Sequence, residues 1–344
     1  MKYFLIILLI IFLAGFFVWR GIYLPQDSDS TEEIAFLVKK GEGAKEISVN
    51  LKEQGLIKYN SLFRVYVLVK GVAGELKAGE YELSPAMTTP EIVNKLASGE
   101  VIKKIITIIE GWNLRDIGWY FENKGMFMAE ELFELAGFPL IDYSETTDLP
   151  PPKDFSQEFD FLEDKPENLG LEGYLFPDTY EISSEDGIED IVRKILTNFD
   201  KKLTLELKEK ITSQGKSIFE IITTASLLEK EVKTFKDKKI VSGILEKRLK
   251  NGIPLQVDAT IIYITGKKTT RISKKETEID SPYNTYRYRD LPLGPISNPG
   301  IESIMAAIYP EDSPYLYYLS TTEGETIFSG TLEEHNIAKA KYLK

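Results

Sequence analysis

The distribution of apolar and charged residues separates a membrane segment from a folded body. Residues 3–19 contain no charged side chain and are dominated by Leu, Ile and Phe, with Lys2 before the run and Arg20 after it. As a helix this run spans about 25 Å at 1.5 Å per residue, close to the thickness of a bilayer core. We therefore predict a transmembrane anchor over residues 1–20 and a polar linker over residues 21–31. The bulky residues at the end of the run disfavour cleavage as a signal peptide.

Beyond the linker, one pattern of apolar positions occurs twice. Residues 36–57 match residues 106–127 at an offset of 70. Each copy combines an alternating strand, a Gly turn, a short amphipathic helix and a Gly stop. A second match, between the Tyr-Glu-Leu at Tyr81 and the Tyr-Glu-Ile at Tyr180, has an offset of 99, so the second copy carries 29 additional residues.

The predicted fold class is α+β. It comprises the N-terminal transmembrane helix, a small βα module over residues 32–105 and a mixed α/β domain over residues 106–344. Small strand–helix–strand modules of this kind resemble LysM domains, which hold glycan chains in a shallow groove. The insertion is expected within residues 126–170, where acidic residues and prolines concentrate, and a long insertion in a compact unit is usually functional or disordered.

A helix predicted over residues 218–232 places carboxylates beside apolar positions. At helical spacing the neighbours of Glu229 are uncharged except for Lys233, and Glu231 follows the apolar pair Leu227 and Leu228. Burial of an unpaired carboxyl group raises its pKa, which allows it to act as a general acid near neutrality. Periodicity does not choose between Glu229 and Glu231, and a structural role at the rim of a core helix also fits the spacing.

Composition narrows the possible chemistry. The chain contains no cysteine, which excludes disulfides, thiol catalysis and thiolate metal sites. The single histidine, His335, cannot build a His-based metal centre, and no Gly-x-Ser-x-Gly motif accompanies it as in a serine hydrolase. The net charge of −12 argues against a nucleic-acid partner. Carboxylate chemistry or plain binding remains.

Three segments of the C-terminal half suit a ligand-binding surface. Residues 255–263 begin with alternating polar and apolar positions, which predicts a strand with one exposed face. Residues 281–286 and 291–300 concentrate prolines, glycines and Asn-containing turns, as shaped loops do. Tyr rings and Asn amides suit pyranose faces and sugar hydroxyls, and a purely structural loop fits the same composition.

Several motifs, in the same order along the chain, resemble those of the YceG-like (MltG) family of endolytic murein transglycosylases. They are LEGYLFPDTYEI (171–182), ASLLEKEV (225–232), KRLKNGIPLQVDATIIY (247–263), SPYNTY (281–286), LPLGPISNPG (291–300) and the ending over residues 310–343. Val257 and Ala259 depart from the pattern, because relatives often carry Thr and Pro at these positions.

The resemblance implies that residues 106–344 form a catalytic domain. Members of this family cleave peptidoglycan strands between N-acetylmuramic acid and N-acetylglucosamine without water, leaving 1,6-anhydromuramyl ends. The catalytic glutamate is then the first Glu of the A-S-x-x-E-K-E segment, which is Glu229. A single glutamate suffices, because it can protonate the glycosidic oxygen and then accept the proton of the sugar C6 hydroxyl. No metal or organic cofactor is implied.

Four loop residues are expected to face the same cleft as Glu229 and to bind sugar hydroxyls: Gln256, Asp258, Asn284 and Tyr286. The expected partners are peptidoglycan glycan strands and the inner (plasma) membrane, with cell-wall synthases as further candidates and no nucleic acid. A short tail before a single-pass anchor predicts that the catalytic domain lies on the periplasmic or extracytoplasmic side.

Two other functions fit the same residues. In a non-catalytic, membrane-tethered glycan-binding scaffold, Glu229 is structural and no new glycan ends appear. A hydrolytic muramidase releases reducing ends and needs a second carboxylate, for which Asp258 and Asp178 are the candidates.

Overall fold

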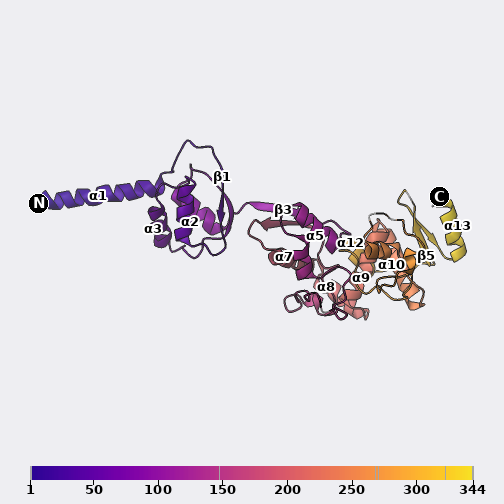
Figure 1. The fold of residues 1–344 in the computed structure, drawn as a ribbon. Helices are drawn as coiled ribbons and strands as arrows, with labels where there is room; N and C mark the ends of the chain where they lie inside the picture. The colour runs from indigo at the N-terminus through magenta and orange to yellow at the C-terminus, as the bar shows by residue number, and fades with distance from the viewer. Residues whose placement is uncertain (1, 147, 268, 270, 322, 343–344) are drawn as a thin grey trace. The chain divides into compact units, whose positions relative to one another are not determined.

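The computed structural model describes residues 2–146, 148–267, 269, 271–321 and 323–342, and its mixed helices and strands confirm the α+β class. The chain forms two compact units (Figure 1). The first comprises Met1–Ile106 with Glu181–Gly187, and the second comprises Thr107–Tyr180 with Ile188–Lys344.

The N-terminal helix α1 covers Lys2–Tyr23. Its segment Tyr3–Tyr23 is long and apolar enough to cross a membrane, with a mean hydropathy of 2.5. The helix therefore continues three residues beyond the predicted end at Arg20. The physical reason is that no proline occurs before Pro25, whose ring disfavours a helical conformation of the preceding residue, and the single Gly21 is tolerated within the helix.

The first copy of the repeat is a two-stranded antiparallel sheet with three helices. Strands β1 and β2 pair with Phe36 opposite Tyr81, and both side chains are fully buried in the core of the unit. Helix α4 begins with a capping box in which Thr88 Oγ1 accepts the Glu91 N–H, and it ends at the left-handed Gly99. The elements are β1 (Ile34–Val38), α2 (Ala44–Glu53), α3 (Asn60–Lys70), β2 (Gly79–Leu83) and α4 (Thr89–Ser98).

The second copy has the same order of elements. They are β3 (Lys103–Thr107), α5 (Leu114–Asn123), α6 (Ala129–Ala136), β4 (Thr179–Ser183) and α7 (Ile188–Lys202), and β3 pairs with β4. The glycines of the two predicted turns, Gly41 and Gly111, both have a positive φ, 90° and 79° respectively. The helix that follows each turn begins three residues later, at Ala44 and at Leu114. This order agrees with the repeat predicted from the sequence.

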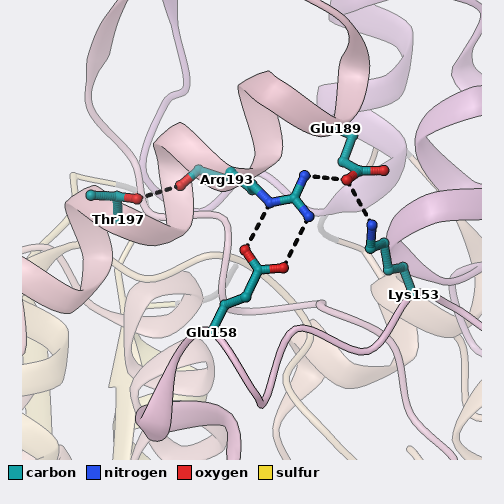
Figure 2. Close-up of polar contacts among 5 residues, drawn as sticks. All are labelled: Lys153, Glu158, Glu189, Arg193 and Thr197. Carbon is teal, nitrogen blue, oxygen red and sulfur yellow. Dashed lines mark hydrogen bonds and ion pairs between the residues drawn. The ribbon is translucent and has the colours of Figure 1, made fainter.

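The additional residues of the second copy lie between α6 and β4 and include the 3-10 helix η1 (Asp160–Leu162). An ion-pair network fastens them to α7 (Figure 2). Arg193 binds both carboxylate oxygens of Glu158, at 2.8 and 2.9 Å, and also contacts Glu189, which pairs with Lys153 at 2.6 Å. These ion pairs thus hold the acidic segment against α7.

The remainder of the second unit is mainly helical. Its elements are α8 (Leu205–Ser213), α9 (Ile218–Glu231), α10 (Phe235–Lys250), α11 (Asp258–Thr265), η2 (Glu276–Glu278), α12 (Ile301–Ile308), the hairpin β5 (Tyr317–Ser320) and β6 (Thr326–Ser329), and α13 (Leu332–Tyr342). The prediction of a strand over residues 255–263 is wrong, since α11 occupies most of this range. A short helix that is buried on most sides lacks a clear helical period, so its pattern resembles that of a strand.

Candidate active site

Helix α9 carries both candidate glutamates in its last turn. It begins at a capping box in which Ser217 Oγ accepts the Glu220 N–H at 3.0 Å. Its middle is buried on almost every side, and it ends at Glu231. Because successive helical residues are rotated by about 100°, Glu229 and Glu231 point about 200° apart. The two carboxylates therefore meet different parts of the unit.

Glu229 is surrounded by hydrogen-bond donors. Both of its carboxylate oxygens lie 3.2 Å from Lys238 Nζ. Its Oε2 also accepts the Gly300 N–H at 3.0 Å and the Ser303 hydroxyl at 2.6 Å. These partners come from α10 and from the start of α12, so this carboxylate connects three helices.

The Glu229–Lys238 pair is buried. The two side chains are only 9% and 4% exposed. Removal of either partner of such a buried pair leaves the other charge uncompensated, which is strongly unfavourable. The Lys238 ammonium, the Gly300 N–H and the Ser303 hydroxyl together hold this carboxylate in place between α9, α10 and α12.

Glu231 has different surroundings. Its carboxyl group is hydrogen-bonded to the Tyr318 side chain and to the backbone N–H of Ala259, in the first turn of α11. Burial first, and then the nearby charge of Asp258, raise the pKa of Glu231 to about 7, against the opposing effect of the two hydrogen bonds. Glu231 therefore has the property that a general acid needs near neutral pH.

Two of the predicted binding residues lie directly beside Glu231. The Tyr286 hydroxyl donates to Asp258 Oδ1, and the carboxylate of Asp258 is exposed. Burial and the bond to Asp258 raise the pKa of Tyr286, with a further contribution from the charge of Glu231. Glu231, Asp258 and Tyr286 thus form one polar cluster, in which Asp258 is exposed and the Glu231 carboxyl group is buried.

Gln256 is held at the edge of this cluster. Its Oε1 accepts a hydrogen bond from Arg248 Nη2 at 3.0 Å, and its N–H donates to the Thr285 carbonyl at 3.0 Å. Its φ of 53° is in the left-handed region that non-Gly residues seldom occupy. Strained backbone of this kind clusters at functional sites.

Asn284 has a different environment from the other three predicted residues. It is fully buried, and its Nδ2 donates to the carbonyls of Thr277 and Ile279 at 3.0 and 2.7 Å. Its Oδ1 accepts the Tyr286 N–H at 2.9 Å. The amide therefore shapes the loop that presents Tyr286, and its predicted contact with sugar stays a prediction.

The four loop residues are absent from the hydrogen-bond partners of Glu229, and their shared cleft with Glu229 stays a prediction. The polar partners of the Glu229 carboxylate come from Lys238, Gly300 and Ser303, whereas Asp258 and Tyr286 lie at Glu231. The reason is the rotation of about 200° between the two glutamates along α9. Asp178, the other candidate for a second carboxylate, is bound to Asn198 and Lys202.

Sequence reasoning missed the groups that differentiate the two glutamates. Lys238 lies on the buried side of α10, and Tyr318 lies on β5, far along the chain. The available signal for Lys238 was a lysine among buried apolar positions of its helix. No local signal identified Tyr318, because tyrosines are frequent throughout residues 309–318.

Glu172 is another buried carboxyl group, and sequence reasoning did not identify it. Burial raises its pKa to about 7, although it accepts the Leu114 N–H at 3.1 Å and the Tyr263 hydroxyl at 3.0 Å. Tyr263 belongs to α11, whose first turn binds Glu231. Glu172 thus connects the start of α5 with the helix that supports the polar cluster.

The chain is similar to proteins of one described family. A model of the YceG-like family matches residues 36–341. An endolytic murein transglycosylase of Bacillus subtilis (strain 168) is 32% identical over 96% of this chain and 90% of its own length. One from Streptococcus pneumoniae (strain ATCC BAA-255 / R6) is 30% identical over 99% of this chain, which spans 64% of the length of that relative.

A solved structure is similar as well. The crystal structure of a YceG-like protein from Listeria monocytogenes aligns with a TM-score of 0.57 and 33% sequence identity. The alignment covers 90% of this chain and all of that one.

Proposed function

This chain belongs to the YceG-like family, and from that premise we propose the reaction and the residues of an endolytic murein transglycosylase. The enzyme is a lyase that cleaves peptidoglycan glycan strands internally, between N-acetylmuramic acid and N-acetylglucosamine. The observation that carries the assignment of its acid is the carboxyl group of Glu231, whose pKa of about 7 accompanies its contacts with Tyr318 and with the first turn of α11.

We propose Glu231 as the single acid and base of the reaction, and Glu229, which the family resemblance implies, is the alternative. The protonated Glu231 donates its proton to the glycosidic oxygen, and the bond from C1 of the muramyl residue to that oxygen breaks. The resulting carboxylate then accepts the proton of the C6 hydroxyl as the C6 oxygen bonds to C1. The proton count balances, the 1,6-anhydro ring closes, and Glu231 returns to its starting state.

The neighbouring residues have distinct proposed roles. Asp258 keeps the pKa of Glu231 high through its charge. The exposed Asp258 and Gln256, with the half-buried Tyr286, offer polar groups for sugar hydroxyls. Glu229, paired with Lys238, holds α9 against α10 and α12. Its proposed role is to fix the helix end from which Glu231 projects.

The N-terminal part supports a location at a membrane. We propose that α1 is a single-pass anchor in the plasma membrane and that the body acts on the extracytoplasmic side, where peptidoglycan lies. The β1-α2-α3-β2 arrangement supports the proposal of a LysM-like, glycan-binding module in the first unit. Cell-wall synthases remain proposed partners.

The products of digestion test this function. Purified protein starting near Thr31 is incubated with isolated peptidoglycan, and the muropeptides are analysed by mass spectrometry. The expected products are fragments with 1,6-anhydromuramyl ends, formed by the wild type and by Glu229→Gln but not by Glu231→Gln. Reducing ends in place of anhydro ends, or no new ends, would contradict the proposal.

A hydrolytic muramidase is the second candidate, because Asp258 supplies a carboxylate close to Glu231. In that reaction water attacks C1, and the product carries a reducing end that is 18 mass units heavier than the anhydro form, the mass of one water. The same spectra therefore distinguish the two reactions. A scaffold without activity would produce neither fragment.

A further inference from the structure

Helix α3 carries an exposed apolar face in the first unit. Its residues Val65, Leu68 and Val69 are 48%, 75% and 79% exposed, whereas Phe63 and Val67, on the opposite side of the helix, are fully buried. We call Val65, Leu68 and Val69 the α3 face. Adjacent exposed apolar residues of this size on one helix are typical of a surface that contacts a partner.

Helix α1 packs along the flank of α3. The rings of Phe17 and Tyr59 are 5.4 Å apart. At Gly21 the helices are so close that an added Cβ would lie 2.3 Å from Leu62 Cδ1. Because Phe17 belongs to the charge-free run of α1, the start of α3 lies where that run ends. In Figure 1, α3 lies at the edge of the unit where α1 joins it.

Three cationic residues lie on α3 or just before it. Lys58, Arg64 and Lys70 are exposed, and α3 itself contains no acidic residue. An apolar face flanked by Lys and Arg is typical of helices that lie in the interface of a bilayer. Anionic lipid headgroups attract such cations over short distances.

We propose that the α3 face rests in the headgroup region of a bilayer that contains anionic phospholipid, with Lys58, Arg64 and Lys70 bound to its phosphates. The inference rests on the proposed insertion of α1. The α3 face points away from the core of the unit, and α1 packs on a neighbouring side of α3, at Leu62 and Tyr66. A membrane that surrounds α1 therefore lies next to the face, and the contact holds the first unit against the lipid surface.

The test uses the full chain reconstituted into lipid vesicles. Because the chain has no cysteine, single substitutions Leu68→Cys and Val69→Cys each offer one site for an environment-sensitive fluorophore. Leu205→Cys on α8 is the matched control, since Leu205 is 72% exposed, and Leu9→Cys reports the insertion of α1. Emission wavelength and quenching by doxyl-labelled phospholipid are measured in vesicles with and without phosphatidylglycerol.

The expected result is a shift of emission to shorter wavelength and quenching by doxyl lipid at positions 68 and 69, stronger with phosphatidylglycerol, and neither effect at position 205. Probes at 68 and 69 that stay in water while position 9 is quenched would overturn the inference and leave the anchor intact. A probe at 9 that is not quenched would overturn both.

Two further outcomes contradict parts of the proposal. A wavelength shift at 68 and 69 without quenching by lipid would mean that protein, such as a second copy of the chain, covers the face. Equal quenching with and without phosphatidylglycerol would overturn the role given to the three cations.

Discussion

Glu229 and Glu231 leave the same turn of α9 and enter different environments. Glu229 is bound by the buried Lys238 and by two further donors, one of them the Ser303 hydroxyl. Glu231 has no cation among the groups that shift its pKa and has the like charge of Asp258 instead. Two carboxylates in one helical turn can thus have different surroundings, because the elements packed on each side of the helix supply different partners.

The largest expected effect is on catalysis. Glu231→Gln should reduce the rate of glycan cleavage by about 10²–10⁴-fold or more, since an amide of nearly the same shape cannot transfer a proton. Turnover of isolated peptidoglycan measures the loss, and circular dichroism checks the fold. An active Glu231→Gln together with an inactive, folded Glu229→Gln would show that Glu229, and not Glu231, is the general acid.

The next effect is on stability. Glu229→Gln should lower the free energy of unfolding by about 3–5 kcal/mol, because it leaves the buried Lys238 ammonium without its counter-charge. Urea unfolding measures the change. The double variant Glu229→Gln with Lys238→Met should recover part of the loss, and a single variant as stable as the wild type would show that the pair has no structural role.

Glu231→Gln, in contrast, should gain stability relative to the wild type as the pH rises. The pKa of Glu231 is raised to about 7 from its ordinary value of 4.5, so ionisation of this group destabilises the folded state as pH rises from about 4.5 through 7. The amide has no such dependence. Its stability relative to the wild type should therefore increase over this range, and an unchanged difference would mean that Glu231 titrates normally.

A smaller effect is expected from Asp258→Asn. The general acid must be protonated, so activity should fall as pH rises through about 7. Removing the charge of Asp258 removes a contribution that raises the pKa of Glu231. The alkaline limb of the pH profile of kcat should therefore move to lower pH. A limb that stays in place would show that the charge of Asp258 does not affect the pKa of the general acid.

The smallest effect is expected at Ala259. Proline at this position removes the N–H that binds Glu231 and lowers its pKa, and the first turn of a helix tolerates proline. Ala259→Pro should move the alkaline limb slightly to higher pH. Ala259→Gly keeps the N–H and should leave the limb unchanged, so equal shifts in both variants would point to a general perturbation of α11.

Local patterns in the sequence predicted much of the framework. The apolar run predicted α1, and the two offsets predicted the repeated order of elements and the insertion of the second copy. Such features depend on neighbours within one or two turns of the chain, which periodicity records. The strand expected over residues 255–263 failed, because α11 is buried on most of its sides and its period is not visible.

The sequence by itself determined the candidates for the acid: two glutamates at the end of one helix, in a chain without cysteine and with a single histidine. It did not determine the surroundings of either glutamate. Those depend on Lys238, Asp258 and Tyr318, which the fold brings from α10, α11 and β5. Only the tertiary structure decided the environments, because desolvation and nearby charge act through space and not along the chain.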